Sequence, residues 1–226
     1  MAEHLILTLG ILGGTGPEGQ GLAYRWAKAG YPVLIGSRTP EKAAAVAAQL
    51  NERLGRDGVE GMANEEAAER CDIAVLTVPY EAHRKTLEGL RDHLQGKLLV
   101  DVTVPLAPPK ISVVHVPPAG SAAQEACQIL GDGAQVVAAF QNVSHEHLLN
   151  DDPVPCDVLV CGTAREAREQ VLKLVAAAGL VGWDAGPIEN AIVVEGLTAI
   201  LLGINKRYKM RAAGIRITGH PPFEPG

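Results

Sequence analysis

The chain has 226 residues, of which 47% are hydrophobic, 20% charged and only 4% aromatic. This length allows one large or two modest domains with an ordinary aliphatic core. The formal net charge of −6 argues against nucleic acid and an anionic membrane surface as partners.

The N-terminal residues show no sign of a targeting segment. Residues 1–12 are apolar but lack a basic start and a small-residue cleavage site. No apolar stretch is expected to reach the length that spans a bilayer. The scattered cysteines are predicted to be buried thiols rather than disulfides or metal ligands, which favours a cytoplasmic protein. They are Cys71, Cys127, Cys156 and Cys161.

A strand–helix–strand unit is predicted over residues 7–38. An apolar run at 7–12 indicates a buried strand, a helix follows over 17–28, and a second strand over 33–35. The glycines between the first strand and the helix have the spacing G-x-G-x-x-G, which predicts a dinucleotide site. Gly14 would allow the tight turn, Gly16 the approach of a pyrophosphate, and Gly19 close helix packing. The alternative is a glycine-rich turn without a ligand. The predicted contact residues here are Gly14, Gly16, Pro17, Glu18 and Gly19.

The end of the second strand favours NADP over NAD. A site for NAD carries an acid about 20 residues beyond the glycines, whereas this chain has Ser37 and Arg38. Arg38 can bind a 2′-phosphate with two parallel N–H bonds, Ser37 can donate a hydroxyl, and Lys42 can add a second positive charge. The alternative makes Ser37 and Thr39 helix caps and the two cations a solvated first turn.

Alternating strands and helices continue to residue 104. Helices are predicted at 41–54, from residue 64, and at 80–94, with strands at 59–62, 72–78 and 97–104. This alternation predicts an α/β fold with a doubly wound, Rossmann-type parallel sheet, whose ligands lie beyond the carboxyl ends of the strands. The loops at Thr77-Val78-Pro79 and at Val104 are therefore expected to line the site. The alternative is that their prolines merely end the strands.

The remaining residues predict a smaller C-terminal α/β domain. A proline-rich linker or active-site loop at 105–120 precedes a helix at 121–130 and a strand at 135–140. We place the domain boundary there, with an NADP-binding domain at 1–140 and a second domain at 141–226. The second domain has a strand at 157–161, a helix at 164–178 and a strand at 180–184. A long apolar helix at 188–205 is expected to be buried between the first domain and a second subunit, which favours a homodimer. The tail at 220–226 is expected to be poorly ordered.

No side-chain signature for acid–base or metal chemistry is found. His145 and His147 lack a third ligand at suitable spacing, so we predict no metal site. His83 and His93 are expected on a helix surface. Hydride exchange with a second, stacked redox cofactor needs only two rings held face to face in a dry cleft.

Several segments resemble one enzyme family in order and spacing: GILGGTGPEGQGLA, VLIGSRTPEKA, CDIAVLTVP, DAGPIENA and VEGLTAILLGIN. The chain resembles the NADPH-dependent reductases of coenzyme F420, also called F420H2:NADP oxidoreductases. The resemblance implies an N-terminal Rossmann domain, a small C-terminal domain, a dimer, and a deazaflavin stacked on the nicotinamide between the domains.

The resemblance also implies individual contacts. Those to the phosphates of NADP fall on Thr15, Ser37, Arg38 and Lys42. Those to F420 fall on Gln141, Asn142, Val143, Gly196, Thr198 and Ala213, with Thr198 and Asn142 hydrogen-bonded to the ring. Gln141, Gly196 and Ala213 depart from the family pattern, and close helix packing is the alternative for Gly196 and Ala213.

The implied reaction is reversible hydride transfer between C4 of the nicotinamide and C5 of the deazaflavin, without a catalytic side chain. The partners are small-molecule cofactor-substrates. Two alternatives stay open: an NADPH reductase of another acceptor (an imine, a flavin or ferric iron), and a non-catalytic NADP-binding regulator.

Overall fold

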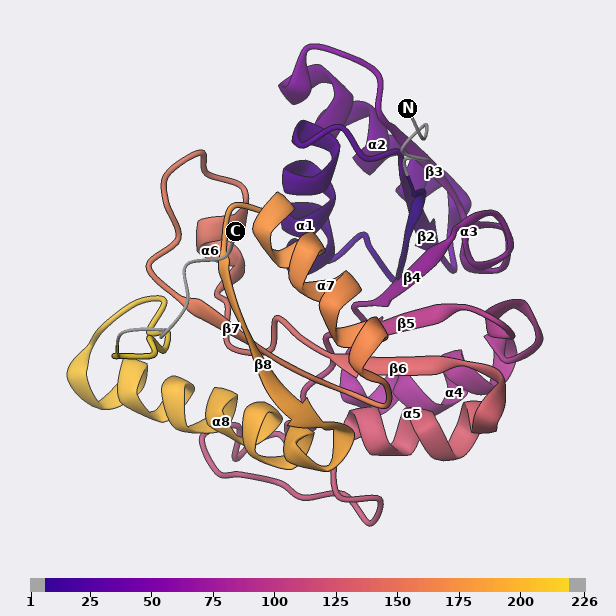
Figure 1. Ribbon diagram of the computed structural model, residues 1–226. Helices are drawn as coiled ribbons and strands as arrows, with labels where there is room; N and C mark the ends of the chain where they lie inside the picture. Colours follow the sequence, from indigo (N-terminus) through magenta and orange to yellow (C-terminus); the bar gives the residue numbers. More distant parts are fainter. Residues whose placement is uncertain (1–6, 220–226) are drawn as a thin grey trace.

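The computed structural model describes residues 7–219, and a single eight-stranded sheet organises them (Figure 1). The strand order is β3-β2-β1-β4-β5-β6-β7-β8. All neighbouring strands are parallel except β6 and β7. The strands are β1 (Leu9–Leu12), β2 (Val33–Ser37), β3 (Val59–Ala63), β4 (Ile73–Leu76), β5 (Leu98–Asp101), β6 (Gln135–Ala138), β7 (Asp157–Gly162) and β8 (Val181–Pro187). The first six have the doubly wound order that reverses between β1 and β4, which confirms the predicted Rossmann-type fold. The predicted disorder of 220–226 lies outside the described residues.

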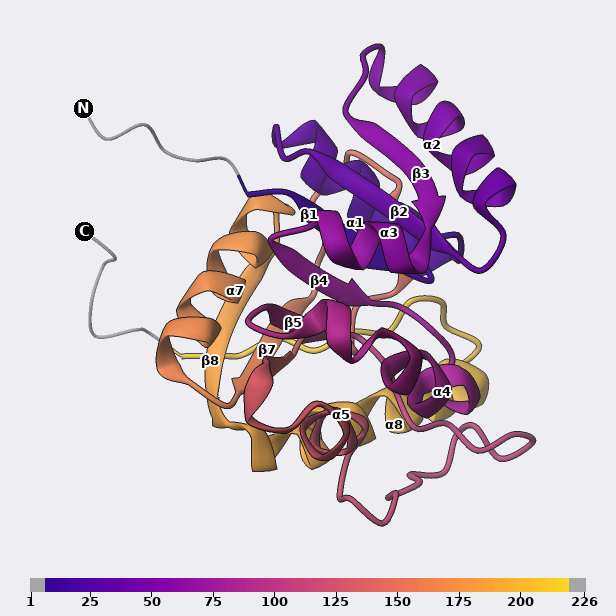
Figure 2. The same ribbon diagram turned by 90° about the vertical axis from the view of Figure 1, so that its right-hand side faces the viewer.

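Helices cover both faces of the sheet (Figures 1 and 2). Because successive side chains of a strand point to opposite faces, each central strand contributes to two cores. On β4, Ile73 and Val75 join the core under α1, α2 and α7, whereas Ala74 and Leu76 join the core under α3, α4 and α5. The helices are α1 (Pro17–Lys28), α2 (Pro40–Leu54), α3 (Asn64–Arg70), α4 (Tyr80–Leu90), α5 (Ala122–Leu130), α6 (His145–Leu148), α7 (Arg165–Ala177) and α8 (Ala191–Tyr208). Short 3₁₀ turns lie at Asp92–Leu94, Gly131–Gly133 and Ile188–Asn190.

The C-terminal strands extend the N-terminal sheet. Strand β7 pairs with β6 in the antiparallel direction, and β8 is parallel to β7. Val158 of β7 and Val171 of α7 share one core with Leu9 of β1 and Trp26 of α1. The boundary at residue 140 falls in the connection between β6 and β7, and the division into two domains stays a prediction.

Helix α8 is less buried than its composition predicts. Val194, Ala199 and Leu201 are buried, but Val193 is 63% exposed and Ile200 is 49% exposed. Our expectation that no segment reaches membrane-spanning length is wrong for the described residues. Ile188–Tyr208 has 21 residues and contains an 18-residue stretch with a mean hydropathy of 1.4, which suffices to span a membrane by length and composition. The same helix places Glu195 in a buried polar network, described below, so it also serves as a packing element of the fold.

Gly61 of β3 lies where α2 crosses the strand. A Cβ at Gly61 would lie 2.2 Å from the carbonyl carbon of Ala43, and backbone atoms cannot rotate away. Gly61→Ala is therefore expected to lower the free energy of unfolding by about 1–3 kcal/mol. Gly89→Ala is the control, because its new methyl group meets nothing within 4 Å and alanine suits the helix. Urea unfolding measures both changes, and equal stability of the two variants would contradict the expectation.

Candidate functional site

A cavity of about 870 Å³ opens beyond the carboxyl ends of the parallel strands. Its walls begin where β1, β2, β4, β5 and β6 end, and they continue onto α6, α8 and residues 210–213. Sixteen of the residues predicted for the site line this cavity: Thr15, Gly16, Pro17, Glu18, Ser37, Arg38, Lys42, Thr77, Val78, Pro79, Val104, Gln141, Asn142, Val143, Thr198 and Ala213. The predicted strands at 72–78 and 97–104 end early, at Leu76 and Asp101, and the residues that follow them line the cavity.

The glycine-rich loop differs in detail from the prediction. The residue with a positive φ is Gly13, at +73°, and not Gly14. Its N–H donates to Oδ1 of Asn64, 3.0 Å away, and a side chain here would strike Val78. Gly14 and Gly19 are not cavity-lining residues. They pack against each other, since a Cβ on Gly19 would lie 2.6 Å from Cα of Gly14. Gly16 is open on its Cβ side, as an approaching pyrophosphate requires.

Two cations lie free at the end of the cavity near β2. Arg38 and Lys42 are exposed, and neither forms an ion pair with any described residue. Ser37 is buried, and its Oγ accepts the N–H of Thr39 at 3.1 Å. Thr39 is the N-cap residue of α2, but its side chain makes no capping bond. The end of β2 therefore offers positive charge without a carboxylate, which fits a 2′-phosphate.

The opposite wall is held in an unusual backbone conformation. Phe140 has φ +74°, a region that costs a bulky residue free energy, and it packs edge-on against Trp26 with ring centroids 5.6 Å apart. The following residue, Gln141, has its carbonyl oxygen 2.8 Å from the donating hydroxyl of Thr198. The hydroxyl proton of Thr198 is thus engaged by the protein rather than directed at a ring, although its lone pairs can still accept. Gly196 does not line the cavity. A Cβ there would lie 3.3 Å from Val114, in the loop before α5.

The segment after Gln141 is fixed to α1 by Arg25. Its guanidinium donates five hydrogen bonds to carbonyl oxygens, four of them in residues 147–152 and one on Ala178. These bonds satisfy the carbonyls at and after the end of α6 and hold this segment beside the last turn of α1. The position of the wall formed by residues 141–146 therefore depends on a side chain outside the cavity.

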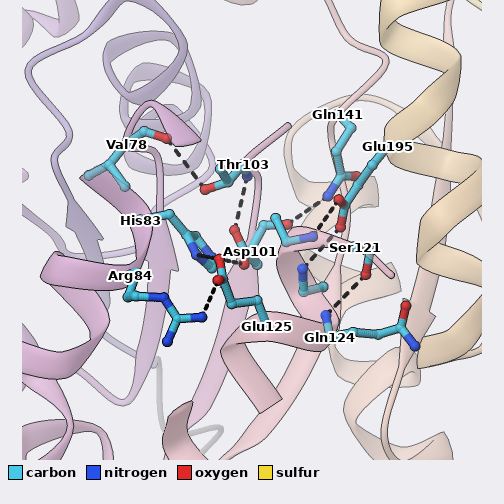
Figure 3. A network of polar contacts seen from close by, with 12 residues as sticks. Val78, His83, Arg84, Asp101, Thr103, Ser121, Gln124, Glu125, Gln141 and Glu195 are labelled. Carbon is cyan, nitrogen blue, oxygen red and sulfur yellow. Dashed lines mark hydrogen bonds and ion pairs between the residues drawn. The ribbon is translucent and has the colours of Figure 1, made fainter. Parts of the chain in front are cut away.

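A buried polar network lies behind the cavity (Figure 3). Our expectation of a surface position for His83 is wrong, because this side chain is fully buried. Its Nε2 lies 2.7 Å from Asp101 of β5, and its Nδ1 lies 3.2 Å from Glu125 of α5. Arg84 of α4 pairs with the other oxygen of Glu125 at 2.5 Å. His83 is spaced like the buried Leu87 and Leu90, at i, i+4 and i+7, which is the signal that could have revealed it.

The network also includes α8. The carboxyl group of Glu195 accepts the N–H groups of Ala122 and Ala123, at 2.7 and 3.0 Å, which are otherwise unpaired donors of the first turn of α5. Burial and the charge of Asp101 raise the pKa of Glu195 to about 8, against the effect of these two donors. For His83, burial disfavours the charged ring, but Asp101 and Glu125 outweigh it, so the pKa is raised.

Asp101 connects the network to the cavity. Its Oδ1 accepts the N–H of Thr103 at 3.0 Å, and its carbonyl oxygen accepts Nε2 of Gln141 at 2.7 Å. Thr103 and Gln141 both line the cavity and follow the neighbouring strands β5 and β6. A single buried residue thus positions two cavity-lining segments, a role that no sequence motif indicated.

The sequence predicts no metal site and buried cysteine thiols. No cluster of three metal-binding side chains occurs within residues 7–219. The four cysteines are free, and Cys127 is half-buried rather than buried.

Comparisons with known proteins agree with this geometry. Residues 8–105 match the family described as coenzyme F420-dependent NADP oxidoreductases. The F420-dependent NADP reductase of Methanothermobacter thermautotrophicus is 40% identical, over 99% of this chain and 100% of the relative. The chain belongs to the family of F420-dependent NADP reductases. The reductase of Methanocaldococcus jannaschii is also 40% identical, over 94% of this chain and 98% of the relative.

A solved structure shares the fold of this chain. A protein from Arthrobacter sp. FB24, described as a candidate F420-dependent NADP reductase, superimposes with a TM-score of 0.79. The match covers 94% of this chain and 100% of that one, at 21% identity. The identity to the two reductases above confirms the family resemblance drawn from the sequence motifs.

Proposed function

We propose that this chain is an oxidoreductase that transfers a hydride between NADP(H) and the deazaflavin coenzyme F420. The proposal rests on the sequence identity of 40%, over nearly the full length of the chain, to two proteins named F420-dependent NADP reductase. The geometry supports it, because the residues predicted to bind the 2′-phosphate, such as Arg38, and those predicted to contact the deazaflavin, such as Gln141 and Thr198, line one cavity.

The residues present fit the two cofactor-substrates. Arg38, Lys42 and Ser37 would bind the 2′-phosphate, and the N–H groups at the start of α1 would bind the pyrophosphate. Thr77–Pro79 and Val102–Val104 would support the nicotinamide, whereas Gln141–Val143, Thr198 and Ala213 would support the deazaflavin. The chemistry that the bound pair supplies is hydride exchange between two rings. The protein contributes orientation and exclusion of water rather than a catalytic side chain.

Mixing the protein with NADPH and oxidised F420 tests the proposal. We expect loss of the visible absorbance of the oxidised deazaflavin, with one NADPH consumed per deazaflavin reduced. NADPH that binds but reduces neither F420 nor a panel of imines, flavins and ferric chelates would favour the non-catalytic regulator. Reduction of another acceptor alone would favour the second alternative.

We also propose a cytoplasmic homodimer without nucleic-acid or membrane partners. The free cysteines favour a reducing compartment. Val193 on α8 is 63% exposed and Val113 in the neighbouring loop 57%, and these segments lie at the same end of the molecule (Figures 1 and 2). An exposed apolar surface of this kind is typical of an interface.

Val193→Glu is expected to convert the dimer to a monomer, because it places a charge in an apolar contact. Analytical ultracentrifugation measures the change. Val181→Glu is the control, since Val181 is 53% exposed but lies on the edge strand β8, away from α8. A wild-type monomer, or a dimer that survives Val193→Glu, would contradict the expectation.

A further inference from the structure

Glu18 lies in the first turn of α1 and lines the cavity. Its Oε1 is buried and has no hydrogen-bond partner in the described part of the chain, and neither carboxyl oxygen forms an ion pair there. Glu18 as a whole is half-buried, but its Oε1 is enclosed by protein without a partner, which disfavours the charged form of the carboxyl group. Burial alone raises the pKa of Glu18 to about 8.

The spacing of residues on α1 indicates which side of the helix carries Glu18. Residues three and four apart share a helix face, and a Cβ on Gly21 would point at Leu148 of α6, 2.4 Å away. Glu18 therefore lies on the α6 side of α1, next to the segment that follows Phe140. The other charged or titratable groups that line the cavity are His145 and Glu146 of α6, Arg38 at the end of β2, Lys42 of α2 and Arg211 beyond α8. None of them contributes to the raised pKa of Glu18.

We propose that Glu18 binds the dinucleotide as a neutral carboxylic acid, so that NADPH binding is coupled to the uptake of a proton. The proposal rests on the proposed function only in requiring a bound dinucleotide. The glycine loop directs the pyrophosphate to the same helical turn that carries Glu18. A neutral acid there can donate a hydrogen bond to the ligand, whereas an ionised carboxylate would repel the two negatively charged phosphates of the pyrophosphate.

The pH dependence of NADPH affinity tests this proposal. Between about pH 7 and 9.5 the 2′-phosphate is already ionised and does not interfere. The dissociation constant of the wild type should be constant up to the pKa of Glu18 and then rise by up to about tenfold per pH unit. Glu18→Gln keeps the shape and a donor but cannot ionise, so its dissociation constant should stay level across the same range.

Glu41→Gln is the matched control. Glu41 has the same place in α2 as Glu18 has in α1, directly after a proline that begins the helix. It is exposed and does not line the cavity, so the variant should keep the wild-type slope. A change of slope in Glu41→Gln equal to that in Glu18→Gln would overturn the proposal.

A calorimetric measurement does not depend on any variant. Titrations of the wild type with NADPH in two buffers of different ionisation enthalpy, at about pH 9, should report uptake of close to one proton. No uptake, or a pH slope that persists in Glu18→Gln, would overturn the role of Glu18. Failure of NADPH to bind at any pH would instead overturn the proposed function.

Discussion

Arg38→Glu is expected to raise the dissociation constant of NADPH by about 10²–10³-fold. Each hydrogen bond to a charged group contributes about 1.5–3 kcal/mol, and the guanidinium can form two to one phosphate. The added carboxylate also repels the 2′-phosphate. NADH lacks that phosphate, so its dissociation constant should change by less than about threefold.

Fluorescence titration with both nucleotides measures this difference. Arg91→Glu makes the same change of charge at an exposed position outside the cavity and should leave both affinities unaltered. Equal losses of affinity for NADPH and NADH would mean that Arg38 acts through the fold or through the overall electrostatic field of the protein, and not through a contact with the 2′-phosphate.

Asp101→Ala is expected to lower the free energy of unfolding by about 3–5 kcal/mol, because it leaves a buried imidazolium without its nearest partner. His83 would lose the carboxylate at 2.7 Å, and the N–H of Thr103 would lose its acceptor. Urea unfolding at about pH 6 measures the loss, because the raised pKa of His83 favours the charged imidazolium at that pH. Asp92→Ala, at an exposed site after α4, is the control.

The ion pair between His83 and Asp101 also predicts how the loss of unfolding free energy in Asp101→Ala varies with pH. The pKa of His83 is raised on folding, so its stabilisation is complete below the unfolded value of 6.5 and disappears as pH rises through the folded value. The effect of Asp101→Ala should therefore shrink at high pH. A double variant, Asp101→Ala with His83→Ala, should cost less than the sum of the single changes. Strict additivity, or a loss below about 1 kcal/mol for Asp101→Ala at low pH, would contradict this account.

Much of the fold could be predicted from local patterns. Apolar runs bounded by glycine or proline identified the first five strands, and helix α1 has the predicted bounds of residues 17–28. The ends of β4 and β5 were less predictable, because apolar residues such as Val102 continue past the sheet into the cavity wall. The pattern of apolar residues in a sequence indicates which residues are buried, and at the end of β5 the buried residues continue beyond the last paired residue of the strand.

Features that depend on tertiary contacts escaped prediction. The positive φ falls on Gly13 because Val78 and Asn64 approach it, and neither is near it in sequence. The direction of β7 likewise depends on which strand it joins. Glu195 lies in an apolar helix, and its partners are N–H groups of α5. These partners are 72 and 73 residues away in sequence, so no local pattern indicates them. The charges at Arg38 and Lys42 were predictable because a phosphate site needs only their proximity in sequence.

The reversal of direction between β6 and β7 has a consequence for the evolution of the second pocket. Strand β6 ends, and β7 begins, at the rim that carries the cavity. The segment between them, residues 139–156, therefore leaves the sheet and re-enters it at the same rim. Such a segment can change length or composition with little effect on strand pairing. We expect homologues to diversify their hydride acceptors there, while the nucleotide half of the molecule keeps its architecture.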